Sequence, residues 1–421
     1  MPPTESARRS AVNMLDQILG EGRLMSELLG SGALERLPPA ERARAQRLTT
    51  QTLRGLERAD KLLARHLRKS PPLHVHNVLR LGTVELALGG DAHGVVNDCV
   101  GLVSGHKKFG SLKGLINAVL RKMAVEGPRD WDSLRAPQMS KWLRDPLRQA
   151  YGADAIRGFE AAHFAGAPLD LTAKGDAAAV AQAVGGTVLP TGSVRLQDAG
   201  QVSALPGFDT GDWWVQDAAA ALPARMLNVQ PGETVLDLCA APGGKTLQLA
   251  AAGANVTALD VSAYRMERVV ENLSRTKLTA QITVGDALTH EGGPYDAILL
   301  DAPCSATGTI RRHADLPHAR DGAEIGELIS LQAQMIDAAL ALLKPGGRLM
   351  FCTCSLLPDE GECQVDEALL RHKSLTVDSS ARDVPGVDPA WHTSEGGLRL
   401  RPDYWADQGG MDGFYMALLR T

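Results

Sequence analysis

The chain has 421 residues and a formal net charge of −5 at pH 7. This length is sufficient for two or three domains with a sizeable hydrophobic core. No segment is apolar for long enough to span a bilayer, and the first residues lack the basic start and apolar run of a signal peptide. We therefore expect a soluble, cytoplasmic protein that makes no contact with a membrane.

The charge is unevenly distributed along the chain. Residues 1–125 carry 19 Lys and Arg against 11 Asp and Glu, a net +8, whereas the remainder carries 25 against 38, a net −13. The first third is therefore the better candidate for contacting a polyanion such as RNA, although a plain solvated surface is the alternative. The basic residues that suggest phosphate contacts are Arg42, Arg44, Arg47, Arg54, Lys61, Arg65, Arg68, Lys69, Lys107, Lys108 and Lys113.

The cysteine pattern argues against disulfides and metal binding. The six cysteines are Cys99, Cys239, Cys304, Cys352, Cys354 and Cys363. A large intracellular chain keeps such scattered thiols reduced. A structural zinc site needs two close pairs, and only Cys352 and Cys354 are close in sequence. We therefore expect no metal.

Hydrophobic periodicity predicts an α/β protein with three domains. Residues 1–125 show a helical period throughout, interrupted at glycines and prolines, which predicts an all-helical domain. Residues 126–215 are weakly patterned and are expected to form a linker and a small α/β module that begins with a strand at 167–173. Residues 216–421 alternate strands and helices regularly, which predicts a Rossmann-like parallel sheet.

The individual elements of this third domain can be placed from the sequence. The predicted strands are 234–238, 255–260, 281–284, 296–300 and 348–352, with a closing pair at 398–401 and 413–418. Helices are expected up to about 252, from 263 to 275 behind the N-cap Ser262, and from 325 to 343. Lys344-Pro-Gly-Gly347 is predicted to be a turn that ends the last of these helices.

The segment Val235-Leu-Asp-Leu-Cys-Ala-Ala-Pro-Gly-Gly-Lys-Thr246 predicts a strand, a tight glycine loop and a helix. Such a loop, with a helix N-terminus behind it, suits a nucleotide-like ligand. It is not a Walker A loop, because Cys239 stands where the first glycine is needed, and it lacks the G-x-G-x-x-G dinucleotide fingerprint. Asp260, which ends the next strand, can accept two ribose hydroxyls and would repel a phosphate. S-adenosylmethionine therefore suits the loop best.

Several reactive side chains follow the predicted strands. Asp260, Asp286, Asp301, Cys304 and Cys354 all fall at strand carboxyl ends. In a parallel sheet these ends share one edge, where ligands bind. Single carboxylates at strand ends often cap helices, but three of them with two cysteines beside a glycine loop are better explained by a functional site.

Two cysteines at this edge are the groups that methylation of cytosine at C5 requires. A thiolate that adds to C6 makes C5 nucleophilic, and a second group assists the later elimination. Helix N-termini nearby favour the thiolate form. Asp301 would hydrogen-bond the base and stabilise the adduct. Spacing alone leaves open which cysteine is the nucleophile.

The motifs Leu238-Cys-Ala-Ala-Pro-Gly-Gly-Lys-Thr246, Asp301-Ala-Pro-Cys-Ser305 and Thr353-Cys-Ser355 resemble those of the Sun/Fmu family of RNA cytosine-5 methyltransferases. The helical part, with Val95-Val-Asn-Asp98 and Leu115-Ile-Asn-Ala-Val-Leu-Arg121, is similar to the NusB-like domain of the bacterial 16S ribosomal RNA members. The resemblance covers nearly the whole chain. It implies a monomeric enzyme that methylates C5 of a cytosine in RNA, with 16S rRNA as the expected substrate.

The resemblance also implies roles for individual residues. Cys354 would be the nucleophile and Cys304 would assist product release, with Asp301 near the reacting groups. The residues implied to contact S-adenosylmethionine are Cys239, Ala240, Ala241, Pro242, Gly243, Gly244, Lys245, Asp260 at the ribose, Asp286 near the adenine, and Asp301.

Two departures from the family pattern leave alternatives open. Ala306 stands where relatives usually carry glycine, and residues 125–170 are the least similar part of the chain. The second departure concerns the RNA target, so methylation of another RNA such as tRNA is one alternative. A ribosome-assembly factor that binds RNA without catalysis is the other.

Overall fold

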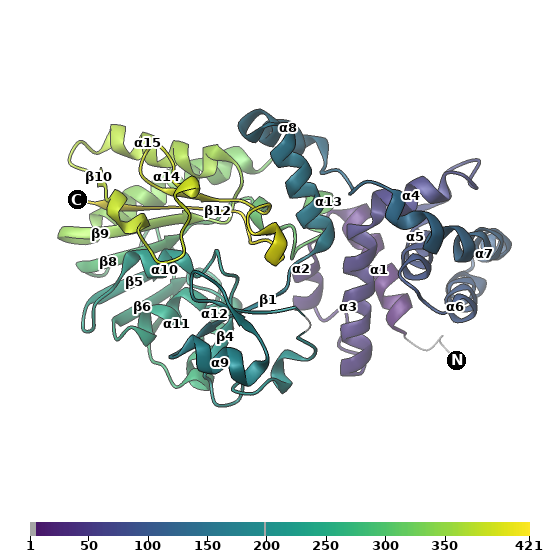
Figure 1. Cartoon of the computed structure of the whole chain (residues 1–421), viewed down its shortest axis with the longest axis horizontal. Helices are drawn as coiled ribbons and strands as arrows, with labels where there is room; N and C mark the ends of the chain where they lie inside the picture. The colour runs from purple at the N-terminus through teal and green to yellow at the C-terminus, as the bar shows by residue number, and fades with distance from the viewer. Residues whose placement is uncertain (1–5, 198) are drawn as a thin grey trace. The chain divides into compact units, whose positions relative to one another are not determined.

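A computed structural model describes residues 6–197 and 199–421. The chain divides into two compact units, Met1–Ala165 with Ile310–Asp321, and Gly166–Thr309 with Gly322–Thr421. The predicted α/β class with a helical first part is confirmed (Figure 1). Over the described residues, no helix combines the length and apolar character needed to cross a membrane. The predicted domain boundaries near 125 and 215 stay predictions.

The first unit is helical, as its period predicts. Its helices are α1 (Ala7–Glu21), α2 (Met25–Gly30), α3 (Pro39–Arg54), α4 (Leu56–Leu63), α5 (Leu73–Ala87), α6 (Ala92–Ser104), α7 (Lys113–Asp130), α8 (Lys141–Ala165) and α13 (Leu316–Ala319). The predicted breaks bound these elements, since Pro39 opens α3 and Pro72 precedes α5. Proline suits a first helical turn because the missing N–H has no partner there in any helix.

Ile310–Asp321, which contains α13, belongs to this helical unit although the segments on either side of it belong to the second unit. Ala314 is 5 % exposed within the helical core. The Asp315 carboxylate accepts a hydrogen bond from the Met25 backbone N–H at 2.8 Å. Hydrophobic periodicity does not predict that this segment joins the helical unit, because the segment is short and its partners lie almost 300 residues earlier in the chain.

The second unit contains a small and a large sheet. The small sheet has the order β2-β3-β1-β4, with β1 (Leu169–Ala173), β2 (Thr187–Val188), β3 (Val194–Leu196) and β4 (Trp213–Val215). Helix α9 (Ala177–Val184) packs against it. The predicted strand at 167–173 is therefore confirmed, and Trp213 is buried in strand packing at 1 % exposure.

The large sheet has the order β10-β12-β9-β8-β5-β6-β7, with β11 paired to β12. Its strands are β5 (Thr234–Leu238), β6 (Asn255–Asp260), β7 (Gln281–Val284), β8 (Tyr295–Asp301), β9 (Leu343–Thr353), β10 (Thr376–Val377), β11 (Leu398–Leu400) and β12 (Phe414–Arg420). The five strands β5 to β9 run parallel, and β12 pairs antiparallel with β9. All of these strands except β10 were predicted, including the closing pair.

The predicted turn at residues 344–347 is wrong in one respect. Strand β9 already begins at Leu343, so Pro345 and the two glycines lie within the bounds of the strand. Gly346 has a φ of +74°, and the register with β8 shifts between Tyr295 and Ala297. Residues 344–347 have no partner in this register, so they bulge from the pairing between Leu343 and Arg348. The regular ladder with β8 begins at Arg348, where the strand was predicted to start.

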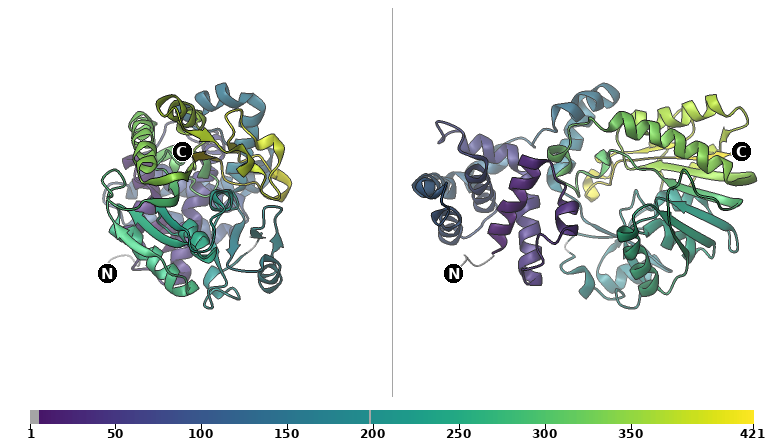
Figure 2. Two further views of the ribbon diagram at one scale, coloured as in Figure 1. Left: turned by 90° about the vertical axis from the view of Figure 1, so that its left-hand side faces the viewer. Right: turned by 180° about the vertical axis from the view of Figure 1, so that it is seen from behind.

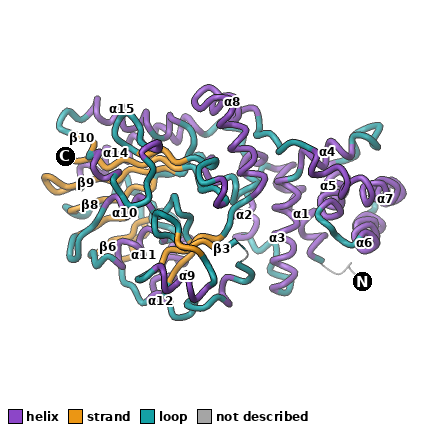
Figure 3. The backbone as a smooth tube through the Cα atoms, in the orientation of Figure 1, coloured by secondary structure: helices purple, strands orange, loops and turns teal. Residues whose placement is uncertain are grey.

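Helices cover both faces of the large sheet, as Figures 1 to 3 show. One face packs against α10 (Leu222–Leu227) and α11 (Gly244–Ala251), with α12 (Ala263–Thr276) beside α11. The other face packs against α14 (Ile325–Ala341) and α15 (Glu362–Arg371). Alternate strand residues supply the two layers: Val235 belongs to the first and Leu236 to the second. The strand ends are thereby left free to carry a site.

Candidate active site

The two cysteines predicted at the sheet edge lie together. Cys304 follows β8 and Cys354 follows β9, and their sulfur atoms are 3.5 Å apart. The pairing of β8 with β9 places Asp301 opposite Cys352, which aligns the ends of the two strands. The Cys354 carbonyl accepts a hydrogen bond from the Gly308 N–H at 2.9 Å, which ties the two loops to each other.

The Cys304 thiol is held in its neutral form. The hydrogen bond with Cys354, followed by burial, raises the pKa of Cys304 well above its usual value. In a closely coupled pair the first proton lost discourages loss of the second. The 3.5 Å contact between the sulfur atoms thus favours the protonated form of Cys304.

A buried carboxylate joins the two cysteine loops. Glu360 is fully buried, and it accepts hydrogen bonds from the Ser305 N–H at 2.9 Å and the Ser355 hydroxyl at 2.6 Å. Gln332 of α14 donates to the same carboxylate at 3.1 Å. Ser305 and Ser355 directly follow the two cysteines, so Glu360 fixes both loops. The sequence analysis missed Glu360, because nothing in its local pattern distinguishes it from a surface acid.

Ala306 holds a conformation that favours glycine. Its φ is +54°, in the left-handed region, which costs an L-residue about 1–2 kcal/mol. The Ala306 carbonyl accepts hydrogen bonds from the Thr309 N–H at 2.9 Å and the Thr309 hydroxyl at 2.8 Å, which hold the turn. Alanine at this position, where relatives usually carry glycine, therefore holds a backbone conformation that glycine would adopt with less strain.

Asp301 is held by Lys245 and by a third cysteine. The Lys245 ammonium lies 2.7 Å from one carboxylate oxygen, and Cys352 donates to the other at 3.6 Å. Lys245 also lies 5.1 Å from the ring centroid of Phe414. Cys352 is fully buried, and burial raises the pKa of its thiol well above the usual value, so it is a core residue and remains protonated.

The glycine loop lies between β5 and α11, as predicted. Gly243 has a φ of +102° and precedes the first residue of the helix, Gly244. Cys239 has a φ of +62°, and burial followed by the charge of nearby Asp301 raises the pKa of its thiol to about 12. This cysteine is therefore a neutral part of the loop, and Ala240, Ala241 and Pro242 complete the turn.

Asp260 and Asp286 occupy different settings. Asp260 is 2 % exposed and accepts from the N–H groups of Ala241 at 3.2 Å and Ser262 at 2.9 Å, so it also braces the glycine loop. Asp286 is exposed after β7, and its carboxylate accepts from the Leu288 N–H at 2.9 Å. Both residues end strands on the glycine-loop side of the sheet.

A second acid missed by the sequence analysis lies under the glycine loop. Asp237 is fully buried within β5, and one of its oxygens accepts from the Thr246 hydroxyl at 2.5 Å while the other has no partner among the described residues. Burial raises its pKa to about 7. In the sequence, Asp237 could have been recognised as an acidic residue within an otherwise apolar strand. These carboxylates fit a ligand that carries positive charge, as S-adenosylmethionine does on its sulfonium and amino groups.

The fold and this edge of the sheet define an S-adenosylmethionine-dependent methyltransferase. Residues 224–420 match the model of the 16S rRNA methyltransferase RsmB/F family, and residues 5–125 match the NusB family. The chain belongs to the RsmB/F family, as the resemblance predicted. It is 34% identical to ribosomal RNA small subunit methyltransferase B of Erwinia tasmaniensis, over 100% of this chain and 99% of that protein. The corresponding protein of Pseudomonas putida is 35% identical, over 100% and 98%.

A solved structure supports the same conclusion about the second unit. A methyltransferase homologue from Pyrococcus horikoshii is 27% identical with a TM-score of 0.55, over 67% of this chain and 95% of that one. S-adenosylmethionine is therefore the cofactor, and it supplies an electrophilic methyl group on sulfur. Among the described residues no group of three or more histidine, cysteine or acidic side chains is arranged to hold a metal ion.

Proposed function

We propose that the chain transfers the methyl group of S-adenosylmethionine to C5 of a cytosine in RNA, with 16S rRNA as the substrate. The observation that carries the proposal is the 3.5 Å separation of the Cys304 and Cys354 sulfur atoms beside Asp301. Relatives named ribosomal RNA small subunit methyltransferase B support the substrate. The enzyme is proposed to act as a monomer in the bacterial cytoplasm.

In this mechanism Cys354 is the nucleophile. Its thiolate adds to C6 of the base, and the electron pair of the C5–C6 double bond forms the new C5–CH₃ bond. The methyl–sulfur bond of the donor breaks in the same step, and its electron pair stays on the sulfur. A base then removes the C5 proton, the C5–C6 double bond reforms, and the Cys354–C6 bond breaks to release the thiolate. Cys304, whose raised pKa keeps it protonated beside Cys354, is proposed to assist this last step.

Asp301 and Lys245 are proposed to position the base. Their contact at 2.7 Å fixes the carboxylate beside the cysteine pair. A carboxylate held in this way can accept a hydrogen bond from a base amino group or share a proton with the ring. The cofactor contacts are proposed at the glycine loop, with Asp260 at the ribose and Asp286 at the adenine.

The helical unit is proposed to contact the RNA through part of its basic surface. Several of the predicted basic residues are engaged within the protein: Lys61 pairs with Glu57 at 2.8 Å, and Arg65 pairs with Asp130 at 2.5 Å. Among the described residues, no ion pair involves Lys107 or Lys113, so these remain available for phosphates. Substituting both by glutamine should weaken RNA binding and lower its salt dependence by about one to two phosphate contacts.

The proposal is tested with unmodified 16S transcript and radiolabelled S-adenosylmethionine. We expect the wild type to label C5 of one cytosine and Cys354→Ala to be inactive without forming an adduct. Cys304→Ala should accumulate a denaturation-resistant protein–RNA complex. Cys363→Ala is the matched control, because Cys363 lies on α15 away from the reacting pair, and it should retain full activity.

Other outcomes distinguish the alternatives. The reverse pattern of adducts would exchange the roles of the two cysteines. Labelling of tRNA and not of 16S transcript would move the substrate to tRNA. Cofactor binding without labelling of any RNA would favour the assembly factor.

A further inference from the structure

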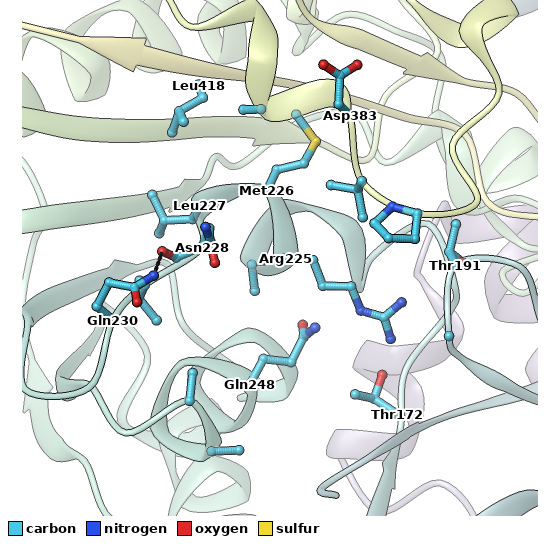
Figure 4. A pocket seen from close by; sticks show the side chains of 18 of the residues that line it. Thr172, Thr191, Arg225, Met226, Leu227, Asn228, Gln230, Gln248, Asp383 and Leu418 are labelled. Carbon is cyan, nitrogen blue, oxygen red and sulfur yellow. Dashed lines mark hydrogen bonds between the residues drawn. The ribbon is translucent and has the colours of Figure 1, made fainter. Parts of the chain in front are cut away.

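A second pocket of the methyltransferase unit lies away from the cysteine pair. It has a volume of about 950 Å³ and is lined by the small sheet, by α10 and by the amino ends of β5 and β9 (Figure 4). Of its lining residues, Glu233 precedes β5 and Arg348 begins the regular pairing of β9 with β8. The cysteines follow the opposite ends of the strands. The pocket is therefore at the other edge of the sheet from the reaction site.

A cation without a counter-charge faces this pocket. Arg225 extends from α10 toward Thr172 and Gln248, as Figure 4 shows. No described residue forms a hydrogen bond or ion pair with its guanidinium, whose Nη1 atom is buried. Burial lowers its pKa, with no neighbouring carboxylate to oppose the shift. Partial burial of a guanidinium is energetically unfavourable unless an anion pairs with it.

Two unsatisfied hydroxyl groups line the same pocket. Thr172 is 4 % exposed and Thr191 is 5 % exposed, and neither side-chain oxygen has a partner in the described structure. Gly192, next to Thr191, approaches the Arg225 guanidinium so closely that an added Cβ would lie 3.2 Å from Nη1. Buried polar atoms are normally satisfied, so such a cluster indicates a missing partner. A guanidinium with two hydroxyl donors matches a phosphate or carboxylate.

Part of the pocket lining is apolar. Its residues include Met226, Leu227, Val384, Pro385 and Leu418. The other two arginines of the pocket are already paired: Arg348 with Glu233 at 2.6 Å and Arg420 with Asp378 at 2.7 Å. Residues 126–421 have a net charge of −13, which disfavours a polyanion on this face. Lys174, the other lysine or arginine of the pocket without an ion pair among the described residues, donates to the Thr276 carbonyl at 2.6 Å. Two such cations beside apolar side chains suit a small ligand better than an RNA strand.

We propose that this pocket binds a small organic anion, with a phosphate or carboxylate held by Arg225, Thr172 and Thr191 and an apolar body against the apolar part of the lining. Pockets for small ligands have this composition and a volume of this order. The site is separate from methyl transfer, and its ligand touches the C-terminal end of α11, whose N-terminal end follows the glycine loop.

The test uses the fluorescent anion 1-anilinonaphthalene-8-sulfonate with the full-length protein. Arg225→Met should weaken binding about tenfold or more, since a hydrogen-bonded charge is lost. Arg225→Lys, which keeps the charge, should weaken it less. Arg420→Met is the matched control, because Arg420 lines the same pocket but is paired with Asp378, and binding should change less than about twofold. Benzoate and inorganic phosphate should displace the probe.

The melting temperatures of the Arg225 variants distinguish a ligand-binding role of this residue from a structural role. Without ligand, the melting temperature of Arg225→Met should equal or exceed that of the wild type, because an unpaired, partly buried charge is removed. Equal probe binding by Arg225→Met and wild type would overturn the proposal, as would no binding to either. A melting temperature lowered in both Arg225 variants would assign the residue a structural role instead. If a 12-nucleotide RNA displaces the probe and benzoate and phosphate do not, the ligand of this pocket is RNA and not a small anion.

Discussion

At the scale of single residues, Glu360 is the side chain through which the two cysteine loops are joined. Glu360→Gln replaces one carboxylate oxygen by an NH₂ group, which then opposes one of the donors from Ser305, Ser355 or Gln332. We expect methyl transfer to slow by about 10- to 100-fold with little change in cofactor affinity. Single-turnover rates and cofactor titrations would measure this split.

The control for Glu360 is Glu327→Gln on the exposed side of α14. This substitution should leave the rate unchanged. A wild-type rate for Glu360→Gln would show that the loops keep their positions without the carboxylate.

Ala306 gives a stability prediction. Because its φ of +54° is strained for alanine, Ala306→Gly should raise the free energy of unfolding by about 0.5–1 kcal/mol, after subtraction of the entropy that glycine adds to the unfolded chain. Urea denaturation would measure this gain. Ala333→Gly in the middle of α14 should instead lower stability by about 1 kcal/mol. Equal losses for both substitutions would contradict the strain at Ala306.

Asp237 gives a prediction about pH. Burial raises the pKa of Asp237 in the folded state to about 7, above the ordinary value of an aspartate, so the folded state binds the proton more tightly than the unfolded state does. The contribution of Asp237 to stability is therefore fully present below about pH 4 and is lost as the pH rises toward 7. Asp237→Asn should be more stable than the wild type at pH 8 and show a smaller difference at pH 4. The same pH dependence in both proteins, measured by urea denaturation, would rule out this role.

At the scale of elements, the cysteine loop after β8 depends on a glycine contact with the start of β12. The Gly413 N–H donates to the Gly308 carbonyl at 2.8 Å. A Cβ at Gly308 would lie 2.0 Å from the Gly413 carbonyl oxygen. Gly308→Ala must therefore displace the loop, and we expect methyl transfer to fall at least about 100-fold while the cofactor still binds.

The matched control for this clash is Gly326→Ala. Gly326 lies on α14, and a Cβ there meets nothing within 4 Å. Activity should be unchanged, and the helix should gain up to about 1 kcal/mol. A Gly308→Ala protein with full activity would show that the loop tolerates the shift.

At the scale of the whole molecule, the chain leaves the methyltransferase unit at Thr309 and returns at Gly322. The cysteine loop is thus joined directly to a segment that belongs to the helical unit. Asp315→Ala removes a buried acceptor and leaves the Met25 N–H without its partner. We expect the helical unit to lose about 1–3 kcal/mol of stability, measured by its urea transition. Glu21→Ala at the end of α1 serves as the comparison and should cost less, because Glu21 is exposed. Equal losses would contradict the role of the Met25 contact.

The sequence by itself determined most of the large sheet and the identity of the reactive groups. Alternating strands and helices, the glycine loop and the positions of Asp301, Cys304 and Cys354 are local patterns, so each could be recognised within a short stretch. The parallel topology then required that these strand ends share one edge. The shared edge brings the two cysteines together, but their separation and the raised pKa of Cys304 needed coordinates.

Only the tertiary structure decided the contacts between distant segments. Glu360 reaches Ser305 across 55 residues, Asp315 reaches Met25 across 290, and the Arg225 pocket joins the small sheet to α10. Such contacts leave no periodic signal, because they depend on how complete elements pack and on which buried groups find partners. Burial likewise sets the pKa of Asp237, which an isolated strand would leave near its usual value.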